Sequence, residues 1–254
     1  MPKQPLPRTP EWPPRSAPRL FVDQHLGLEA QVVIEGPQAH YLGRVMRMGQ
    51  GDVVILCDNL TGEWAACVSQ TGKRAIHLDV TEHLRGREEV PDLWLCPALI
   101  KKDRFDMVLE KATELGVARI SPLITRRCVA DKLNADRART IVTEAAEQCA
   151  RTALPPVDAP VKLDAYLRSM PDDRTLFFAD ELGGEPAARA FAAKAPPAAI
   201  LIGPEGGFDD TERALIREHP NAKPISLGPR ILRAETAAIA AIALWMGAAG
   251  DWRG

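Results

Sequence analysis

The chain has 254 residues, 46% of them hydrophobic, which is enough for one large domain or two smaller domains with a packed core. Its 32 Lys and Arg against 34 Asp and Glu give a formal net charge of −2, which excludes a protein that binds polyanions over its whole surface. Residues 101–151 carry 11 Lys and Arg against 8 Asp and Glu, whereas residues 152–254 carry 11 against 14. A nucleic-acid footprint is therefore expected in the first half or the middle of the chain.

The first eighteen residues contain seven prolines and no apolar core of the kind found in a signal peptide. They predict an extended, disordered leader over residues 1–18. No stretch approaches the roughly 20 apolar residues that span a bilayer, so we expect a cytoplasmic protein without a membrane partner. The 5 cysteines are scattered without a C-x-x-C pair, which predicts reduced thiols and no metal site.

Residues 20–84 consist of short segments that alternate apolar with polar residues, such as "AQVVIEG", "GDVVILCD" and "RAIHLDV". Turn residues separate them at intervals of about 8–12, a pattern typical of a small antiparallel barrel or sandwich. Within this block, "QAHYLGRVMRMGQGD" predicts a short helix, with Tyr41, Val45 and Met48 at helical spacing. Arg44 and Arg47 share another side, either as a binding surface or as a solvated basic face.

The polar stretch "RGREEVPD", residues 85–92, is the predicted linker, and after it strands alternate with helices. "LWLCPALI" predicts a buried strand, and "DRFDMVLEKATELG" a helix capped by Asp103 and ended by Gly116, with an apolar face that includes Phe105 and Leu109. "VARISPLI" predicts another strand, followed by a helix near residues 135–150 and strands at "RTLFFAD" and "AAILIG". This alternation is typical of an α/β domain with a mainly parallel sheet.

The strand "AAILIG" runs into the turn "LIGPEGGF", residues 201–208, at the edge where open α/β sheets bind ligands. Its glycines allow positive φ and close approach of a ligand, although a plain strand-to-helix turn would also use them. The turn has no phosphate-binding glycine motif. Instead Glu205 is followed by Asp209, Asp210 and Glu212, which favours a ligand that is cationic or rich in N–H and O–H donors.

A second segment, "ISLGPRILRAETAAIAAIALWMGAA", passes from a short strand through a Gly-Pro turn into a helix of Ala, Ile, Leu, Trp and Met. Such a helix is either central in the core or completed by a partner subunit. Arg230 and Arg233 flank Ile231 and Leu232, so polar donors stand beside a small apolar patch, as in a cofactor pocket.

These segments, together with "KATELGVARISPL" and "EAAEQCAR", closely resemble the RsmE family of 16S ribosomal RNA methyltransferases, in the SPOUT superfamily. The resemblance covers residues 19–245, in order. It implies a PUA-like β-barrel for RNA binding over residues 19–86 and an α/β, trefoil-knotted SPOUT domain with a mainly parallel sheet over residues 91–254. It also implies a homodimer that transfers methyl from S-adenosylmethionine to N3 of a uridine in 16S rRNA of the small subunit.

The resemblance implies roles for individual residues. The cofactor is expected at Leu201, Gly203, Glu205, Gly206, Leu227, Gly228, Ile231, Leu232, Arg233 and Thr236. RNA contacts are expected at Arg19, Arg44, Arg47, Lys101, Gln148 and Arg151.

The chain departs from the family at "TRRC", residues 125–128, where Arg126 replaces the usual acid and adds basic surface. For catalysis, we expect Arg233 to stabilise the anion that develops when the uracil imide loses its proton. A bracing role, in which Arg233 pairs with Glu205 or Glu235, is the alternative. Glu205 is a possible base, but cofactor binding is its simpler role.

Two other functions compete with this reading. One is a SPOUT methyltransferase that acts on another rRNA position or on tRNA. The other is a non-catalytic RNA-binding assembly factor that has kept the fold. The intact cofactor motifs favour the enzyme.

Overall fold

The computed structural model describes residues 12–14, 16–193 and 196–253, and it divides into two compact units. The smaller unit comprises the chain up to Glu88 together with Ala150–Ala153, and the larger unit comprises Glu89–Cys149 and the chain from Leu154 onward. The leader predicted over residues 1–18 lies mostly outside the described residues. In its described part, the Trp12 indole N–H donates a hydrogen bond of 2.7 Å to the Glu82 carboxylate.

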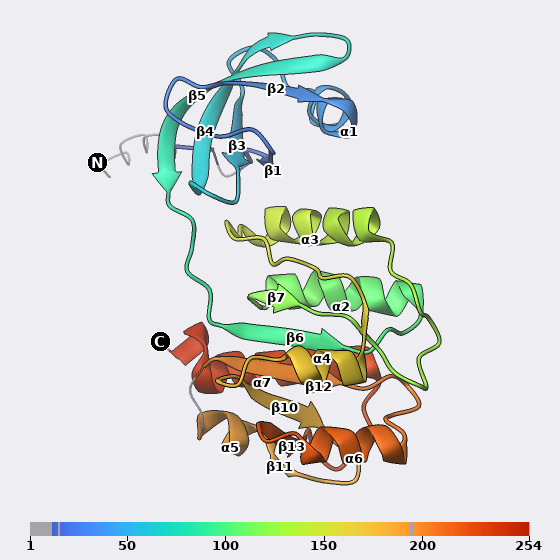
Figure 1. The fold of residues 1–254 in the computed structure, drawn as a ribbon. Coiled ribbons are helices and arrows are strands. Elements are labelled where there is room, and N and C mark those ends of the chain that lie inside the picture. The colour runs from blue at the N-terminus through green and yellow to red at the C-terminus, as the bar shows by residue number, and fades with distance from the viewer. Residues whose placement is uncertain (1–11, 15, 194–195, 254) are drawn as a thin grey trace, which may run out of the picture. The chain divides into compact units, whose positions relative to one another are not determined.

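The smaller unit is a five-stranded sheet in the order β1-β3-β4-β5-β2 (Figure 1). All neighbours are antiparallel except β1 and β3. No hydrogen-bonded ladder joins β1 to β2 in the described chain, so the strands form a half-barrel rather than a closed barrel. The elements are β1 (Arg19–Phe21), β2 (Gln31–Glu35), α1 (Gly36–His40), η1 (Tyr41–Val45), β3 (Val53–Cys57), β4 (Glu63–Thr71) and β5 (Ala75–Arg85).

The predicted helix near residue 41 is present, but it faces the core differently from the expectation. After α1 the chain winds as one π-helical turn, η1, which is wider than an α-helical turn. The side of this segment that faces the core carries Leu42, which is fully buried, whereas Tyr41 and Val45 are 37% and 61% exposed. The prediction that Tyr41, Val45 and Met48 form one apolar side is therefore wrong for the first two residues.

The larger unit is built on a six-stranded sheet in the order β11-β13-β10-β12-β6-β7, and every neighbouring pair is parallel. This arrangement confirms the predicted α/β architecture with a mainly parallel sheet. The strands are β6 (Leu93–Pro97), β7 (Arg119–Ile120), β8 (Leu123–Ile124), β9 (Val161–Lys162), β10 (Thr175–Ala179), β11 (Glu185–Pro186), β12 (Ala198–Ile202) and β13 (Ala222–Ser226). The helices are α2 (Lys102–Glu114), α3 (Ala135–Cys149), α4 (Leu163–Ser169), α5 (Ala187–Ala192), α6 (Asp210–Glu218), α7 (Ala234–Ala249) and η2 (Asp251–Arg253).

Helices cover both faces of this sheet, so alternate residues of the central strand β12 pack into two different cores. Its Ile200 and Ile202 join the core beneath α2, α5 and α7, while the alternate residues Ala199 and Leu201 join the core beneath α4 and α6. Side chains of successive strand residues point to opposite faces, so a strand covered on both sides is apolar throughout. All of Ala198–Ile202 is buried, as predicted.

Two local predictions need correction. The segment "VARISPLI" is not one strand: β7 pairs with β6, whereas β8 pairs with β9 in a separate two-stranded sheet. Asp103 does not cap α2, because the helix begins at Lys102 and Lys101 occupies the cap position. Asp103 instead lies in the first turn, where its negative charge favours the positive end of the helix dipole.

Candidate cofactor site

A cavity of about 370 Å³ lies at the carboxyl ends of β10, β12 and β13. That volume is within the range of small-molecule sites, roughly 300–1,000 Å³. The two segments that the sequence singled out, 203–208 after β12 and 226–232 after β13, both line it. Although they are far apart in the sequence, the parallel sheet brings their strand ends to one edge.

The turn 203–208, which we call the cofactor turn, depends on its glycines for different reasons. Gly207 has φ of 66°, a left-handed conformation that costs a side-chain-bearing residue energy. Gly203 and Gly206 are not in that region. A Cβ at Gly203 would lie 3.1 Å from the Phe208 ring, which is 1% exposed. The expectation of positive φ therefore holds for Gly207, whereas Gly203 is small because the ring packs against it.

The acids after the turn serve two purposes rather than one. Asp209 is the N-cap of α6, and its carboxylate accepts the Glu212 backbone N–H at 2.7 Å in a capping box. This hydrogen bond, together with the one from Arg126, lowers the pKa of Asp209 below its usual range. The interpretation of all four acids as an anionic loop for a cationic ligand is thus wrong for Asp209 and Glu212. Of the four, only Glu205 lines the cavity.

Another wall of the cavity, missed by the sequence analysis, contains Asp180 and Glu181, which follow β10. The Asp180 side chain is fully buried and accepts from Arg213, and from Arg217 at 2.6 Å. Arg213 also donates to Glu181 at 2.5 Å and to the Phe208 carbonyl at 3.3 Å. These bonds connect α6 to this wall of the cavity, formed by the residues that follow β10. No short motif marks them, because the partners are over thirty residues apart in the chain.

Arg104, in the first part of α2, was also missed. Its Nη1 lies 3.3 Å from Glu205 Oε1, and its Nε lies 3.8 Å from Glu235 Oε1 in the first turn of α7. The alternative role for Arg233 in the sequence analysis was to brace the site by pairing with one of these acids. In the structure Arg104 is placed between both, and Arg233 is exposed at the N-cap of α7 without an ion pair to any described residue.

Seven of the ten residues predicted to bind the cofactor line the cavity: Gly203, Glu205, Gly206, Leu227, Gly228, Ile231 and Leu232. The other three do not. The Leu201 side chain is buried in the core under α4 and α6, while Arg233 and Thr236 are exposed at the start of α7. Ile231 is 92% exposed although it borders the cavity, which leaves an apolar side chain at its mouth.

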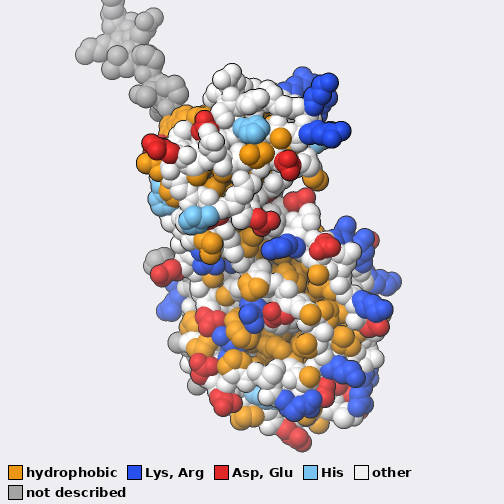
Figure 2. Space-filling model, turned by 45° about the horizontal axis from the view of Figure 1, so that its top comes forward, with side chains coloured by type: hydrophobic (Ala, Val, Ile, Leu, Met, Phe, Trp, Pro, Cys, Tyr) orange, Lys and Arg blue, Asp and Glu red, His pale blue; other side chains and the backbone are white. Residues whose placement is uncertain are grey.

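The residues predicted to contact RNA differ in their surroundings. Arg44 and Arg47 are exposed on the smaller unit, and Lys101 and Gln148 are exposed on the larger unit. Arg19 donates to the buried Glu63 carboxylate at 2.5 Å. Figure 2 shows Lys and Arg side chains gathered along one edge of the larger unit, beside a hydrophobic area.

Arg151 is the predicted RNA residue whose surroundings fit the prediction least. Its side chain is 5% exposed and lies 3.8 Å from the Glu88 carboxylate, within the smaller unit. The same carboxylate accepts the backbone N–H groups of Thr152 and Ala153 at 2.7 and 3.0 Å. These contacts favour a structural role in which Arg151 helps to anchor the segment Ala150–Ala153.

Arg126, the residue that departs from the family pattern, forms an ion pair with Asp209. Its Nη1 lies 3.0 Å from Asp209 Oδ2, and its backbone N–H donates to Glu212 at 2.8 Å. The side chain is 62% exposed, so Arg126 both supports the cap of α6 and adds positive charge to the surface.

Among the described residues, no cluster of three or more His, Cys, Asp or Glu is arranged to hold a metal ion. Within the same ranges, no helix is long and apolar enough to cross a membrane.

Each of the two units contains a segment that matches a family of known proteins. Residues 87–246 match the family model of an RNA methyltransferase domain, and residues 34–81 match that of an RNA methyltransferase PUA domain. The ribosomal RNA small subunit methyltransferase E of Rickettsia conorii is 32% identical over 89% of this chain and 93% of its own length. The protein of that name from Synechocystis is 34% identical over 89% of this chain and 76% of its own.

A solved structure is also similar over almost the whole chain. It is a ribosomal RNA small subunit methyltransferase E of Neisseria gonorrhoeae bound to S-adenosyl methionine. It superposes with a TM-score of 0.86 at 27% identity and covers 93% of this chain and 99% of the other.

Proposed function

The chain belongs to the RNA methyltransferase family of ribosomal RNA small subunit methyltransferase E, and we propose that it methylates N3 of one uridine in 16S rRNA. It is an S-adenosylmethionine-dependent enzyme with a PUA domain at its N-terminal end. The observation that carries the proposal is that the segments 203–208 and 226–232, the family motifs, line one cavity at the edge of the parallel sheet.

The residues of the cavity fit S-adenosylmethionine. Small residues such as Gly203, Gly206 and Gly228 let a ligand reach backbone groups, while Leu227 and Leu232 offer apolar surface to an adenine ring. Glu205 supplies a carboxylate that suits the positive charge of the cofactor. When bound, the cofactor supplies an electrophilic methyl group on a sulfonium. We assign its binding to these residues together with Ile231, which borders the cavity, and not to Leu201, Arg233 or Thr236, which do not line it.

The chain's own task is to orient the uracil and to stabilise its deprotonated form. Methylation at N3 requires loss of the imide proton, so negative charge develops over the ring and its two carbonyl oxygens. We propose that Arg233 faces this charge, because it is exposed and its chain neighbours Leu232 and Ala234 line the cavity. Arg104, rather than Arg233, lies against Glu205 and Glu235. The base must leave its stack to reach the site, which favours a single-stranded or distorted RNA segment.

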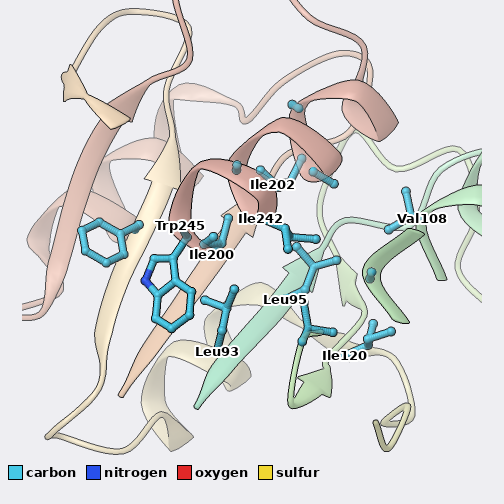
Figure 3. Packing of buried hydrophobic residues seen from close by; sticks show 14 of the residues in the cluster. Leu93, Leu95, Val108, Ile120, Ile200, Ile202, Ile242 and Trp245 are labelled. Atoms are coloured by element: carbon cyan, nitrogen blue, oxygen red, sulfur yellow. The ribbon is translucent and has the colours of Figure 1, made fainter. Parts of the chain in front are cut away.

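We also propose the trefoil knot and the homodimer that the resemblance implies. Support for the dimer comes from α7. Its Ile242 and Trp245 point into the core (Figure 3), yet Ile239, Ala240, Ala243 and Leu244 on its other side are apolar and only partly covered. Leu244 is 40% exposed. A second copy of the chain would cover this face. Arg19, Arg44, Arg47, Lys101 and Gln148 are proposed to contact RNA.

The test is nucleoside mapping by mass spectrometry of 16S rRNA from a strain that lacks the protein. The 30S subunits of that strain are mapped before and after incubation with the purified protein and S-adenosylmethionine. We expect one 3-methyluridine to be missing and then restored. The Arg233→Ala variant should restore it much more slowly, by roughly 10²-fold, the order expected when one group that stabilises a developing charge is lost.

The other outcomes separate the competing functions. If the nucleoside is present without the protein, the substrate is another RNA position or tRNA. If the protein binds S-adenosylmethionine but methylates no RNA, an assembly factor that has kept the fold is the better description.

A further inference from the structure

We propose that Arg104 and Arg127 are positioning residues that hold the cofactor turn from outside the cavity. The proposal rests on the proposed function, because it takes the cofactor turn as the place where S-adenosylmethionine is held. Neither arginine lines the cavity. Their effect on the reaction would therefore pass entirely through the conformation of residues 203–208.

The cofactor turn has few bonds of its own to fix it. Three of its six residues are glycines, which have the greatest backbone freedom. Within the turn, the Gly207 N–H donates to the Pro204 carbonyl at 2.9 Å. Phe208 anchors one end in the core, but Glu205 and Gly206, in the middle of the turn, are exposed. The path of the chain at these two residues must therefore be fixed by other segments.

Arg127 holds Gly206. It lies in the segment that follows β8, and its Nη1 donates to the Gly206 carbonyl at 2.7 Å and reaches the Phe208 carbonyl at 3.5 Å. Its side-chain stem also packs against the turn, since a Cβ at Gly206 would lie 3.4 Å from Arg127 Cδ. A charged donor forms stronger hydrogen bonds than a neutral one, so this contact restrains the peptide group of Gly206.

Arg104 holds Glu205. It approaches from α2 and lies between the carboxylates of Glu205 and Glu235, at 3.3 and 3.8 Å. Glu235 belongs to α7, which follows the second cofactor segment, and it is 8% exposed. Arg104 thus links the two segments that line the cavity without entering it. It also balances two nearby acids that would otherwise repel each other.

The test compares the affinity of the full-length protein for S-adenosylmethionine in four variants, measured by isothermal titration calorimetry. The variants are Arg104→Ala, Arg127→Ala, Arg127→Lys and the control Arg168→Ala. Arg168 is an exposed arginine paired with Asp164 within α4, at 3.0 Å, and it has no contact with the turn. Each positioning arginine should weaken binding about tenfold when replaced by Ala, as expected for one hydrogen bond from a charged donor. The control should bind like the wild type.

Two further measurements separate positioning from general support of the fold. The midpoint of thermal unfolding should stay close to that of the wild type in the Arg127 variants and in the control, because Arg127 and Arg168 are exposed. In the methylation assay, KM for S-adenosylmethionine should rise about tenfold, with kcat at saturating cofactor within about twofold. Arg127→Lys should recover most of the affinity, since a single N–H donor reaches the Gly206 carbonyl.

Wild-type affinity in both Arg→Ala variants would overturn the proposal. So would an equal loss in the control, or a loss that follows thermal stability. These results are independent of the RNA substrate. If the wild type binds the cofactor but leaves 16S rRNA unmethylated, the proposed function fails, while the affinities still decide the roles of Arg104 and Arg127.

Discussion

At the scale of single residues, the motifs locate the cavity, but they do not reveal the contacts that shape it. Gly203, Glu205, Gly206 and Gly228, which the resemblance implies as cofactor residues, line the cavity. The arginine that lies against Glu205 is Arg104, which is 101 positions away in the chain. Periodicity and local spacing report on neighbours in sequence, whereas long-range pairing depends on how the sheet brings strand ends together. That is why Arg104, Arg213 and Asp180 could not be predicted.

Gly207 offers a test of the strained turn. We expect Gly207→Ala to destabilise the protein by about 1–2 kcal/mol, the cost of a left-handed backbone for a residue with a Cβ. The new Cβ would also lie 2.6 Å from Glu181 Oε1, so affinity for S-adenosylmethionine should fall as well. Chemical denaturation and calorimetry measure the two effects. Gly27→Ala is the control, since nothing lies within 4 Å of the Cβ position there. Equal stability of the two variants would contradict this reading.

We expect the Glu63 carboxylate to make a pH-dependent contribution to the stability of the smaller unit. Burial alone would raise its pKa, but hydrogen bonds from Arg85 and Arg19 hold the pKa below its usual range. A carboxylate with a lowered pKa stabilises the fold above the pKa of the unfolded chain, about 4.3, and this stabilisation is lost as the pH falls through the folded pKa. Glu63→Gln should therefore lower the unfolding midpoint at pH 7, and the difference from the wild type should shrink below about pH 4. A difference that stays constant down to pH 2.5 would rule this out.

At the scale of elements, the sequence predicted the strands of the sheet better than the helices between them. The apolar runs that became β6, β10 and β12 are buried on both sides, so their composition alone identifies them. The short helices α4 and α5 were missed because seven and six residues carry too little periodicity. α6 was missed for another reason: its capping box, Asp209 and Glu212, was attributed to ligand binding.

The partly covered apolar side of α7 leads us to expect a dimer, and a substitution there tests it. Leu244→Asp places a charge on the partly covered apolar side of α7, so it should convert a dimer into a monomer with little loss of monomer stability. Size-exclusion chromatography with light scattering measures this. Leu215→Asp is a matched control, because Leu215 on α6 is also 40% exposed. A monomeric wild type, or a dimer that survives Leu244→Asp, would show that this face does not mediate self-association.

At the scale of the whole molecule, the chain forms two units: the larger unit contains the cavity, and the smaller unit carries the exposed Arg44 and Arg47. From the change in pattern after residue 85, the sequence predicts one domain over residues 19–86 and another over residues 91–254. The knot that we propose rests on the family resemblance alone, because threading of the chain leaves no local signal in a sequence. The sequence analysis missed the return of Ala150–Ala153 to the smaller unit, which depends on Glu88 accepting the N–H groups of Thr152 and Ala153.

The division predicts independent effects on the two ligands. Arg44→Ala combined with Arg47→Ala should weaken RNA binding and flatten its salt dependence by about two units of slope, while affinity for S-adenosylmethionine is unchanged. Titrations at several salt concentrations measure the slope. Lys73→Ala with Arg74→Ala, two exposed basic residues of the same unit, is the control. Equal losses in both pairs would indicate attraction by general charge, and a loss of cofactor affinity would show that the units do not act separately.

The return of residues 150–153 to the smaller unit has a consequence for biosynthesis. During synthesis the N-terminus of a chain leaves the ribosome first, and domains usually fold in the order in which they emerge. Here the smaller unit cannot be completed when residue 88 has emerged, because Glu88 still lacks the N–H groups of Thr152 and Ala153. Arg85 likewise still lacks the Ala150 carbonyl to which it donates. Translation must first pass through α2 and α3, so the first unit to be synthesised is finished only when much of the second has been made.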